Sequence, residues 1–235
     1  MKLGVLETGA PPAALADRFG DYPAMFRRLL GEGAYEYRAF DAAGGELPDV
    51  ATACDAYLVT GSAAGVYDPL PWISALKDFL IEARGQVPLV GVCFGHQVMA
   101  EAFGGRVEKS SKGWGVGLQS YAIQAPRPWT EAGVSMVTIP GSHQDQVVEV
   151  PPDAVVVGGN DFCPNGLLAY PGQGAISMQL HPEFEPAYAV ALIESRRGAR
   201  INAAQADAAV ASYARADDRA RVGGWIRRFL ADPVA

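Results

Sequence analysis

One cysteine lies in a sequence pattern that could make it a nucleophile. Cys93 directly follows the apolar run of residues 89–92, and glycines stand two residues before and two residues after it, at Gly91 and Gly95. A nucleophile on a sharp strand-to-helix turn needs this spacing, because the strained backbone leaves no room for flanking side chains. We therefore predict that Cys93 lies on a nucleophile elbow at the start of a helix.

The start of that helix would activate the thiol. Backbone N–H groups of a first helical turn lack intrahelical acceptors and the helix dipole is positive there, so both favour the thiolate form of Cys93. The same groups can bind a developing oxyanion, and the Phe94 N–H is the first predicted donor. Taken alone, the pattern also fits a Cys93 that is only a small buried apolar residue. A zinc site of Cys93, His96, His143 and Cys163 is disfavoured, because no second closely spaced pair of ligands is present.

A histidine and a carboxylate follow another apolar run, that of residues 175–180. Pro182 disfavours helix at His181, so we expect an extended chain in which His181 and Glu183 point to the same side. Glu183 could then orient the imidazole, while His181 takes a proton from a thiol and gives it to a leaving amine. By itself this pattern also fits a strand-end His181 beside a solvated Glu183. Together with the cysteine elbow it predicts a Cys-His-Glu triad.

Short apolar runs bounded by glycine, proline or aspartate predict the strands that position these residues. They are residues 3–6, 35–40, 56–59, 89–92, 134–139, 147–150, 155–157 and 175–180. Helical spacing predicts helices over residues 22–30, 72–83 and 94–103. Strand and helix alternate in the first half, which favours a parallel sheet with helices on both faces. Strands dominate from about 114 to 180, so we expect antiparallel pairs at one edge before a last strand returns to the core.

The predicted fold is therefore α/β, a mixed and mostly parallel sheet flanked by helices. Residues 187–197, 205–216 and 219–231 show helical spacing without an intervening strand, and predict two or three helices packed on the outside. No internal repeat or low-complexity linker divides the chain. We expect one domain over residues 1–235, with a core of about 1–197 and a helical C-terminal extension of about 198–235.

Composition and charge narrow the classes of function. The 235 residues include 19 Lys and Arg against 26 Asp and Glu, a formal net charge of −7. Such a protein does not attract a phosphate backbone, so nucleic acid is not an expected partner. No apolar run suits a signal peptide or a membrane span, and three widely spaced cysteines do not resemble a disulfide framework. We expect a cytoplasmic protein without a membrane partner, in which a cysteine is free for chemistry.

Four motifs, in order along the chain, resemble those of class I glutamine amidotransferases. G-V-C-F-G-H-Q at residues 91–97 is similar to the nucleophile elbow of that family, and L-H-P-E at 180–183 is similar to its histidine and glutamate. T-G-S-A-A-G-V-Y-D at 60–68 resembles its oxyanion strand. G-S-H-Q-D-Q-V at 141–147 resembles the S-H-x-D-x-V loop of GMP-synthetase-type domains. Together the motifs cover about residues 55–185.

The resemblance implies a flavodoxin-like core and a reaction on a γ-glutamyl amide. Cys93 would attack the amide to give a glutamyl thioester and ammonia or an amine, and water would then release glutamate. His181 would serve as base and then as acid, with Glu183 orienting it. Gly61 would donate a second oxyanion N–H beside that of Phe94. The resemblance assigns the glutamyl amino and carboxylate groups to Gln97, Ser142, His143, Gln144 and Asp145, and it implies neither cofactor nor metal.

Two departures keep the specific role open. Thr60-Gly61-Ser62 stands where amidotransferases bound to synthetases commonly have Gly-Gly-Pro, and the 235 residues contain no Gly-rich phosphate loop of a synthetase. We expect a cysteine amidase for glutamine or another γ-glutamyl compound, such as a γ-glutamyl peptidase that acts alone. One alternative is an ammonia-supplying subunit of a partner synthetase, and another is a non-catalytic glutamyl-binding or regulatory protein. Gly61, Gln97 and His143 could each instead be structural.

Overall fold

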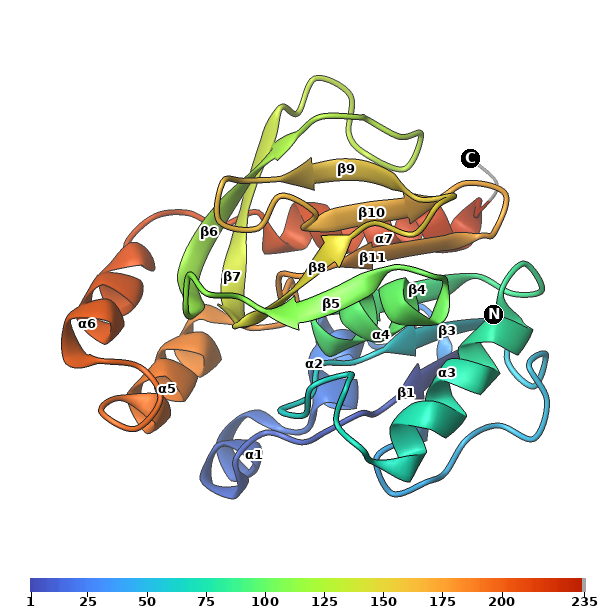
Figure 1. Ribbon diagram of the computed structural model, residues 1–235, viewed down its shortest axis with the longest axis horizontal. Helices are drawn as coiled ribbons and strands as arrows, with labels where there is room; N and C mark the ends of the chain where they lie inside the picture. The colour runs from blue at the N-terminus through green and yellow to red at the C-terminus, as the bar shows by residue number, and fades with distance from the viewer. Residues whose placement is uncertain (234–235) are drawn as a thin grey trace.

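A computed structural model describes residues 1–233, and a large mixed sheet runs through its centre (Figure 1). The strands are β1 (Lys2–Leu6), β2 (Glu36–Phe40), β3 (Ala56–Val59), β4 (Leu89–Val92), β5 (Arg106–Lys109), β6 (Gly115–Ile123), β7 (Met136–His143), β8 (Asp145–Glu149), β9 (Val155–Gly159), β10 (Leu167–Tyr170) and β11 (Ala175–Met178). Nine of them form the sheet, in the order β2-β1-β3-β4-β11-β10-β9-β6-β7. The other two, β5 and β8, pair separately.

The direction of the strands confirms the predicted mixed sheet. β2, β1, β3, β4 and β11 run parallel, and β10, β9, β6 and β7 continue the sheet in antiparallel pairs. The last strand in sequence, β11, returns to the centre beside β4, as expected. Three strands were not predicted, namely β5, β6 and β10. β6 contains Gly115 and Gly117, and β5 has Val107 as its single apolar residue, so neither shows a clear apolar run.

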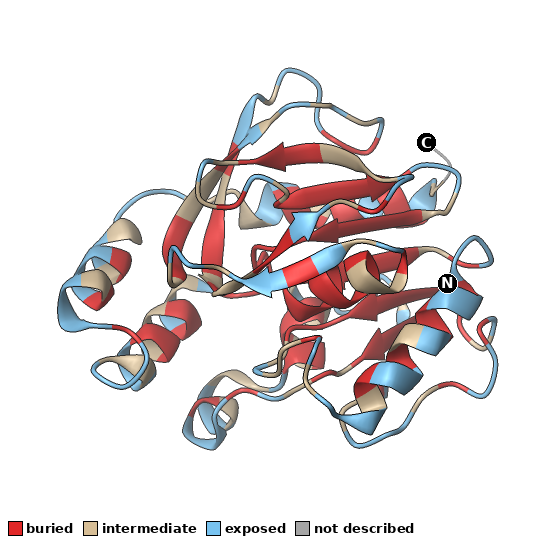
Figure 2. Ribbon diagram, in the orientation of Figure 1, coloured by how far each residue is buried: buried red, intermediate tan, exposed pale blue. Residues whose placement is uncertain are grey.

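The helices cover both faces of the sheet. They are α1 (Ala13–Phe19), α2 (Tyr22–Leu30), α3 (Pro71–Ala83), α4 (Phe94–Ala102), α5 (Pro186–Arg196), α6 (Ala203–Ser212) and α7 (Arg219–Ala231). α2 and α7 bury Phe26 and Trp225 in one apolar cluster with Leu58. α3 and α4 bury Leu76 and Met99 in another cluster on the opposite face. The central strands are therefore buried on both sides (Figure 2), as a parallel sheet requires.

The C-terminal helices differ in how they pack. α5 and α6 contact each other and β6 at one end of the molecule, as expected for helices on the outside (Figure 1). The expectation was wrong for α7, which packs against α2 and β7 with Trp225 and Ile226 fully buried. Its apolar residues recur three or four positions apart, so one stripe of the helix is buried in the core. Among residues 1–233, no helix has both the length and the apolar character to cross a bilayer.

Candidate active site

The ends of adjacent parallel strands bring the predicted catalytic residues to one edge of the sheet. Cys93 directly follows β4, and the strands on either side of β4 are β3 and β11. Gly61 lies two residues beyond β3, and His181 lies three residues beyond β11. Crevices for ligands in open parallel sheets form outside the carboxyl ends of the strands. Residues distant in sequence therefore flank Cys93 from both sides.

Cys93 lies on a strained turn between β4 and α4. Its φ is 55° and its ψ is −103°, and it is the single non-glycine residue with positive φ among residues 1–233. A Cβ at Gly91 would overlap the backbone of Gly95, and a Cβ at Gly95 would overlap the carbonyl oxygen of Val59. Strand and helix can approach this closely only because both positions are glycine. The structure thus has the elbow that the sequence predicts, with Phe94 as the first residue of the helix.

His181 and Glu183 form a buried pair. His181 Nδ1 lies 2.7 Å from Glu183 Oε1, and the two residues are 3% and 2% exposed. The imidazole also stacks on the Phe184 ring, with 3.9 Å between the ring centroids. Because the carboxylate occupies Nδ1, the proton on that nitrogen is fixed and Nε2 is left to exchange protons.

Gly61 lies between this pair and the cysteine. A Cβ at Gly61 would stand 3.0 Å from His181 Cε1 and 3.7 Å from Cys93 Cβ. A side chain at position 61 would therefore push the imidazole away. Cys93, His181 and the predicted oxyanion segment thus meet at one point, although the sequence places them in three separate motifs.

Thr8 holds the oxyanion segment in place and was not predicted from the sequence. It is 1% exposed, and its hydroxyl donates to the carbonyl oxygens of Thr60 (2.9 Å) and Gly61 (3.2 Å). Its backbone N–H donates to Thr60 Oγ1 at 3.0 Å. Thr8 belongs to none of the four motifs. A polar residue just beyond an apolar parallel strand next to β3 was the signal that could have found it.

The histidines differ in charge. Burial lowers the pKa of His181, but the nearby Cys93 and Glu183 outweigh burial and raise it to about 10. Burial, with a contribution from His143, lowers the pKa of His96 to about 3. Burial likewise lowers the pKa of His143 to about 4. At neutral pH, His181 is therefore the one histidine of the three that carries a positive charge, and it lies beside Cys93.

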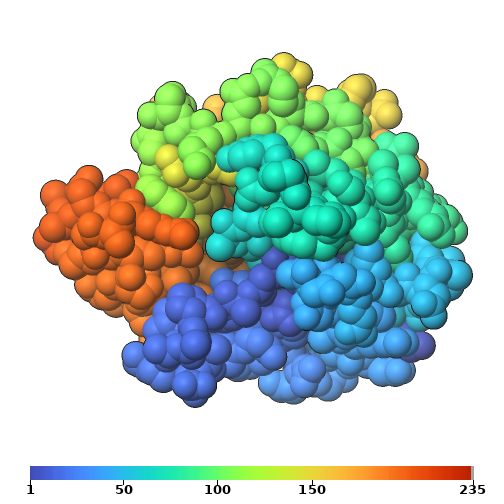
Figure 3. All heavy atoms as spheres, turned by 60° about the horizontal axis from the view of Figure 1, so that its bottom comes forward, coloured from blue at the N-terminus to red at the C-terminus, as the bar shows by residue number. Residues whose placement is uncertain are grey.

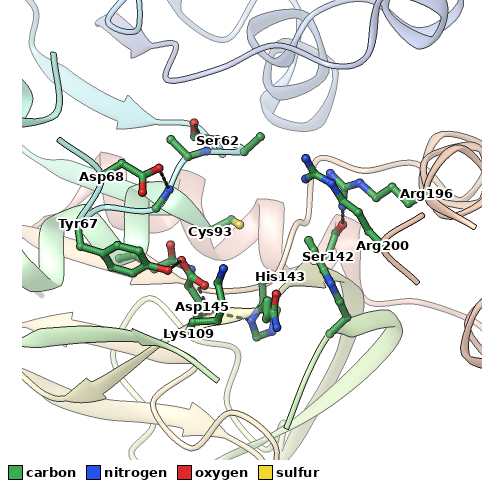
Figure 4. Close-up of a pocket in the computed structure, with 16 residues that line it drawn as sticks. Ser62, Tyr67, Asp68, Cys93, Lys109, Ser142, His143, Asp145, Arg196 and Arg200 are labelled. Carbon is green, nitrogen blue, oxygen red and sulfur yellow. Dashed lines mark hydrogen bonds between the residues drawn. The ribbon is translucent and has the colours of Figure 1, made fainter. Parts of the chain in front are cut away.

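A cavity of about 380 Å³ opens beside Cys93 and contains the remaining predicted residues (Figure 4). Figure 3 shows the surface hollowed between the blue N-terminal segment, the teal segment that follows β3, and the orange helices. The predicted substrate-binding residues all line this cavity: Gln97, Ser142, His143, Gln144 and Asp145. The structure therefore brings all five of them together around one space.

Hydrogen bonds fix the orientation of these residues. Gln97 Nε2 donates to the Asp145 carbonyl oxygen at 3.0 Å and to Gln179 Oε1 at 3.1 Å, so both amide hydrogens are used. His143 Nδ1 lies 3.1 Å from the same carbonyl oxygen. The Tyr67 hydroxyl donates to Asp145 Oδ2 at 2.8 Å. Neither Tyr67 nor Gln179 was predicted, because these contacts join segments far apart in sequence.

The other two cysteines lie outside the cavity. Cys54 and Cys163 are 2% and 1% exposed, and burial raises the pKa of both thiols, that of Cys163 to about 11. Across the described residues, no three His, Cys, Asp or Glu side chains are grouped so that they could hold a metal ion.

Comparisons with known proteins match the sequence and the fold of this chain. A sequence profile described as "Glutamine amidotransferase class-I" matches residues 43–193. A glutamine amidotransferase-like protein of Schizosaccharomyces pombe is 26% identical over 85% of the chain and 86% of its own length. Gamma-glutamyl peptidase 3 of Arabidopsis thaliana is 26% identical over 71% of the chain and 70% of its length. One subunit of the glutamine-hydrolysing GMP synthase of Methanopyrus kandleri is 32% identical over 46% of the chain and 58% of its length.

A solved structure has the same fold. A glutamine amidotransferase from Methylobacillus flagellatus superposes with a TM-score of 0.77, at 20% identity, over 99% of the chain and 93% of its own length. The α/β fold and the resemblance to GMP-synthetase-type domains and γ-glutamyl peptidases are thereby confirmed.

Proposed function

Because the chain belongs to the class I glutamine amidotransferase family, we propose that it is a cysteine amidase for the γ-glutamyl amide of glutamine or another γ-glutamyl compound. One observation carries this proposal: the strained Cys93 elbow and the buried His181–Glu183 pair converge on Gly61. That arrangement suits attack of a thiolate on an amide carbonyl, followed by proton transfer to the leaving nitrogen.

The first half of the reaction forms a thioester. The Cys93 sulfur attacks the γ-carbonyl carbon, and the carbonyl oxygen becomes an oxyanion that accepts hydrogen bonds from the N–H groups of Phe94 and Gly61. His181 then donates its proton from Nε2 to the amide nitrogen, and the C–N bond breaks. The products are a glutamyl thioester on Cys93 and a free amine, or ammonia when the substrate is glutamine.

The second half releases glutamate. The imidazole of His181, now neutral, takes a proton from a water molecule, whose oxygen attacks the thioester carbonyl. Collapse of the second oxyanion breaks the C–S bond and regenerates the Cys93 thiolate beside the His181 imidazolium. Glu183 holds Nδ1 throughout and stabilises the imidazolium, without itself taking up the proton.

The 380 Å³ cavity supplies the groups to hold the glutamyl part. Both amide hydrogens of Gln97 bind protein oxygens, so its Oε1 is left to accept a hydrogen bond from the α-ammonium. The Asp145 carboxylate adds a negative charge on the same wall. Lys109 also lines the cavity and provides a cation for the α-carboxylate.

A release assay on the purified protein tests this function. Glutamate and ammonia are measured with glutamine, γ-glutamyl dipeptides and, as a control amide one methylene shorter, asparagine. We expect glutamate from the γ-glutamyl compounds and no release from asparagine. A protein that releases no glutamate from any of them, alone or with cell extract, is not the proposed amidase.

The similarity to a GMP synthase subunit favours a second candidate function, the supply of ammonia to a partner synthetase. Such a protein depends on its acceptor enzyme to complete the site, so the isolated chain would hydrolyse glutamine slowly and γ-glutamyl dipeptides hardly at all. An amidase that acts alone would instead turn over a γ-glutamyl dipeptide briskly. The ratio of kcat/KM for the dipeptide and for glutamine, with and without cell extract, separates the two.

A further inference from the structure

A second cavity adjoins Cys93 on the side of His181. It has a volume of about 350 Å³. Gly61 and His181 line this second cavity, whereas neither of them lines the first one. Its walls also include the largely apolar side chains of Tyr22, Phe184 and Leu192. Cys93 therefore stands between two spaces of different character, one polar and one partly apolar.

The proposed reaction places the leaving group in this second cavity. His181 must reach the departing nitrogen to protonate it, so the amine lies on the side of the imidazole. A molecule of the size of water or ammonia occupies only about 30 Å³. The cavity of about 350 Å³ is thus far larger than the ammonia of glutamine needs, and it has room for an amino acid.

Two arginines at the boundary of both cavities have no anionic partner. Arg196 and Arg200 line each cavity, and neither takes part in an ion pair within residues 1–233. Arg196 Nη1 donates to Ser142 Oγ at 2.6 Å, and its guanidinium lies 5.4 Å from the centre of the Trp114 ring. Both of these partners are neutral. Figure 4 shows the two arginines on one side of Cys93, opposite Tyr67, Asp68 and Asp145.

The surroundings of Arg196 favour an external anion. The residue is half-buried, and burial, the largest influence, lowers its pKa. Tyr22 and Tyr188 act in the opposite direction, and the nearby positive charge of Arg200 acts in the same direction as burial. A cation withdrawn from water without a counterion is costly, and the cost falls when an anion binds. A planar guanidinium matches the two oxygens of a carboxylate particularly well.

We propose that Arg196 and Arg200 bind a carboxylate of the leaving group, so that the preferred substrate is a γ-glutamyl amino acid or peptide with a free carboxylate near the scissile amide. This inference rests on the proposed amidase function. Tyr22, Phe184 and Leu192 then contact the side chain of the departing residue. Glutamine, which loses only ammonia, engages neither the arginines nor this apolar wall.

Two substrates that differ only in this charge test the inference. γ-Glutamylglycine ends in a carboxylate, and γ-glutamylglycinamide ends in a neutral amide of the same size. We expect kcat/KM to be about 10-fold or more higher for the acid, the range of one charge-assisted hydrogen-bonded pair. In Arg200→Ala the ratio should fall towards one, and Arg200→Lys should keep part of it. Arg200 is exposed, so its replacement leaves the core intact.

Arg84→Ala is the matched control, because Arg84 is also an exposed arginine in a segment that follows a helix, but it lines neither cavity. It should keep the wild-type ratio. Equal kcat/KM for the two compounds, or an unchanged ratio in Arg200→Ala, overturns the inference while the amidase stands. An equal loss on both compounds in Arg200→Ala also overturns it, because the arginine would then hold the glutamyl carboxylate. No glutamate from either compound or from glutamine overturns the proposed function, and this inference with it.

Discussion

The hydroxyl of Thr8 lies 2.9 Å from the carbonyl oxygen of Thr60, and this bond ties the end of β1 to the segment that carries Gly61. Thr8→Val keeps the shape of the side chain and removes the donor. We expect the free energy of unfolding to fall by about 0.5–1.5 kcal/mol, the net worth of one hydrogen bond, because the Thr60 carbonyl oxygen still accepts from the Gly95 N–H. Because the Gly61 N–H then loses its position, kcat should fall about 10-fold or more with a smaller change in KM.

Thr8→Ser is the control for this prediction, since it keeps the hydroxyl and should keep most of kcat. Chemical denaturation and steady-state kinetics on both variants provide the two measurements. If Thr8→Val loses stability but retains kcat, Thr8 has a structural role without positioning the oxyanion segment.

The two members of the buried acid–imidazole pair should differ in their effect on turnover. His181→Ala removes the group that transfers the proton and should lower kcat by about 10²–10⁴-fold. Glu183→Gln keeps the imidazole and loses only its orienting charge, so the loss should be smaller. Glutamate release under single-turnover conditions gives the comparison. Unchanged turnover in Glu183→Gln would show that Glu183 is not a member of the catalytic triad.

Titration of the three histidines by nuclear magnetic resonance should show one charged imidazole at pH 7. Cys93 and Glu183 raise the pKa of His181 to about 10, whereas burial lowers the pKa values of His96 and His143 to about 3 and 4. The His181 signal should therefore keep its protonated shift up to about pH 9. Cys93→Ser should lower that pKa by removing one of the two raising influences. A His181 imidazole that is neutral at pH 7 in the wild type would contradict the positive charge predicted for it.

Stability should depend on pH through Glu7, outside the active site. Burial, then Asp21 and Asp41, raise the pKa of Glu7 from 4.5 to about 7. The folded state thus binds the Glu7 proton more tightly than the unfolded state does. The contribution of the protonated carboxyl to stability is therefore full below pH 4.5 and is lost as the pH rises through 7. Relative to wild type, Glu7→Gln should raise Tm at pH 8 and change it little at pH 4. Equal shifts of Tm at both pH values would contradict this, and the exposed Glu46→Gln is the control.

The sequence predicts best what depends on local spacing. The buried runs at β3 and β4 have the same bounds in the structure as in the prediction, because strands buried on both faces are continuously apolar. The elbow at Cys93 was equally visible, since its geometry demands glycine at fixed offsets. Both features are set by residues within a few positions of each other.

Features that depend on packing between distant segments were not predicted. Thr8 can hydrogen-bond to Thr60 only because β1 lies beside β3. Gln179 can hydrogen-bond to Gln97 only because β11 lies beside β4. Arg196 and Arg200 belong to the helical tail, whose contact with the catalytic edge is a matter of tertiary packing. α7 shows the same limit, because its apolar stripe does not reveal whether it covers the sheet or another helix.

The most direct test of the account compares Cys93→Ser with Cys54→Ser. Both cysteines are buried and free, but only Cys93 lies on the elbow beside His181. Glutamate release from a γ-glutamyl dipeptide is measured for each variant, together with labelling by a glutamine-analogue electrophile, followed by intact mass. We expect that Cys93→Ser loses both turnover and label, while Cys54→Ser retains both. Equal labelling of the two variants, or glutamate release that survives in Cys93→Ser, would contradict it.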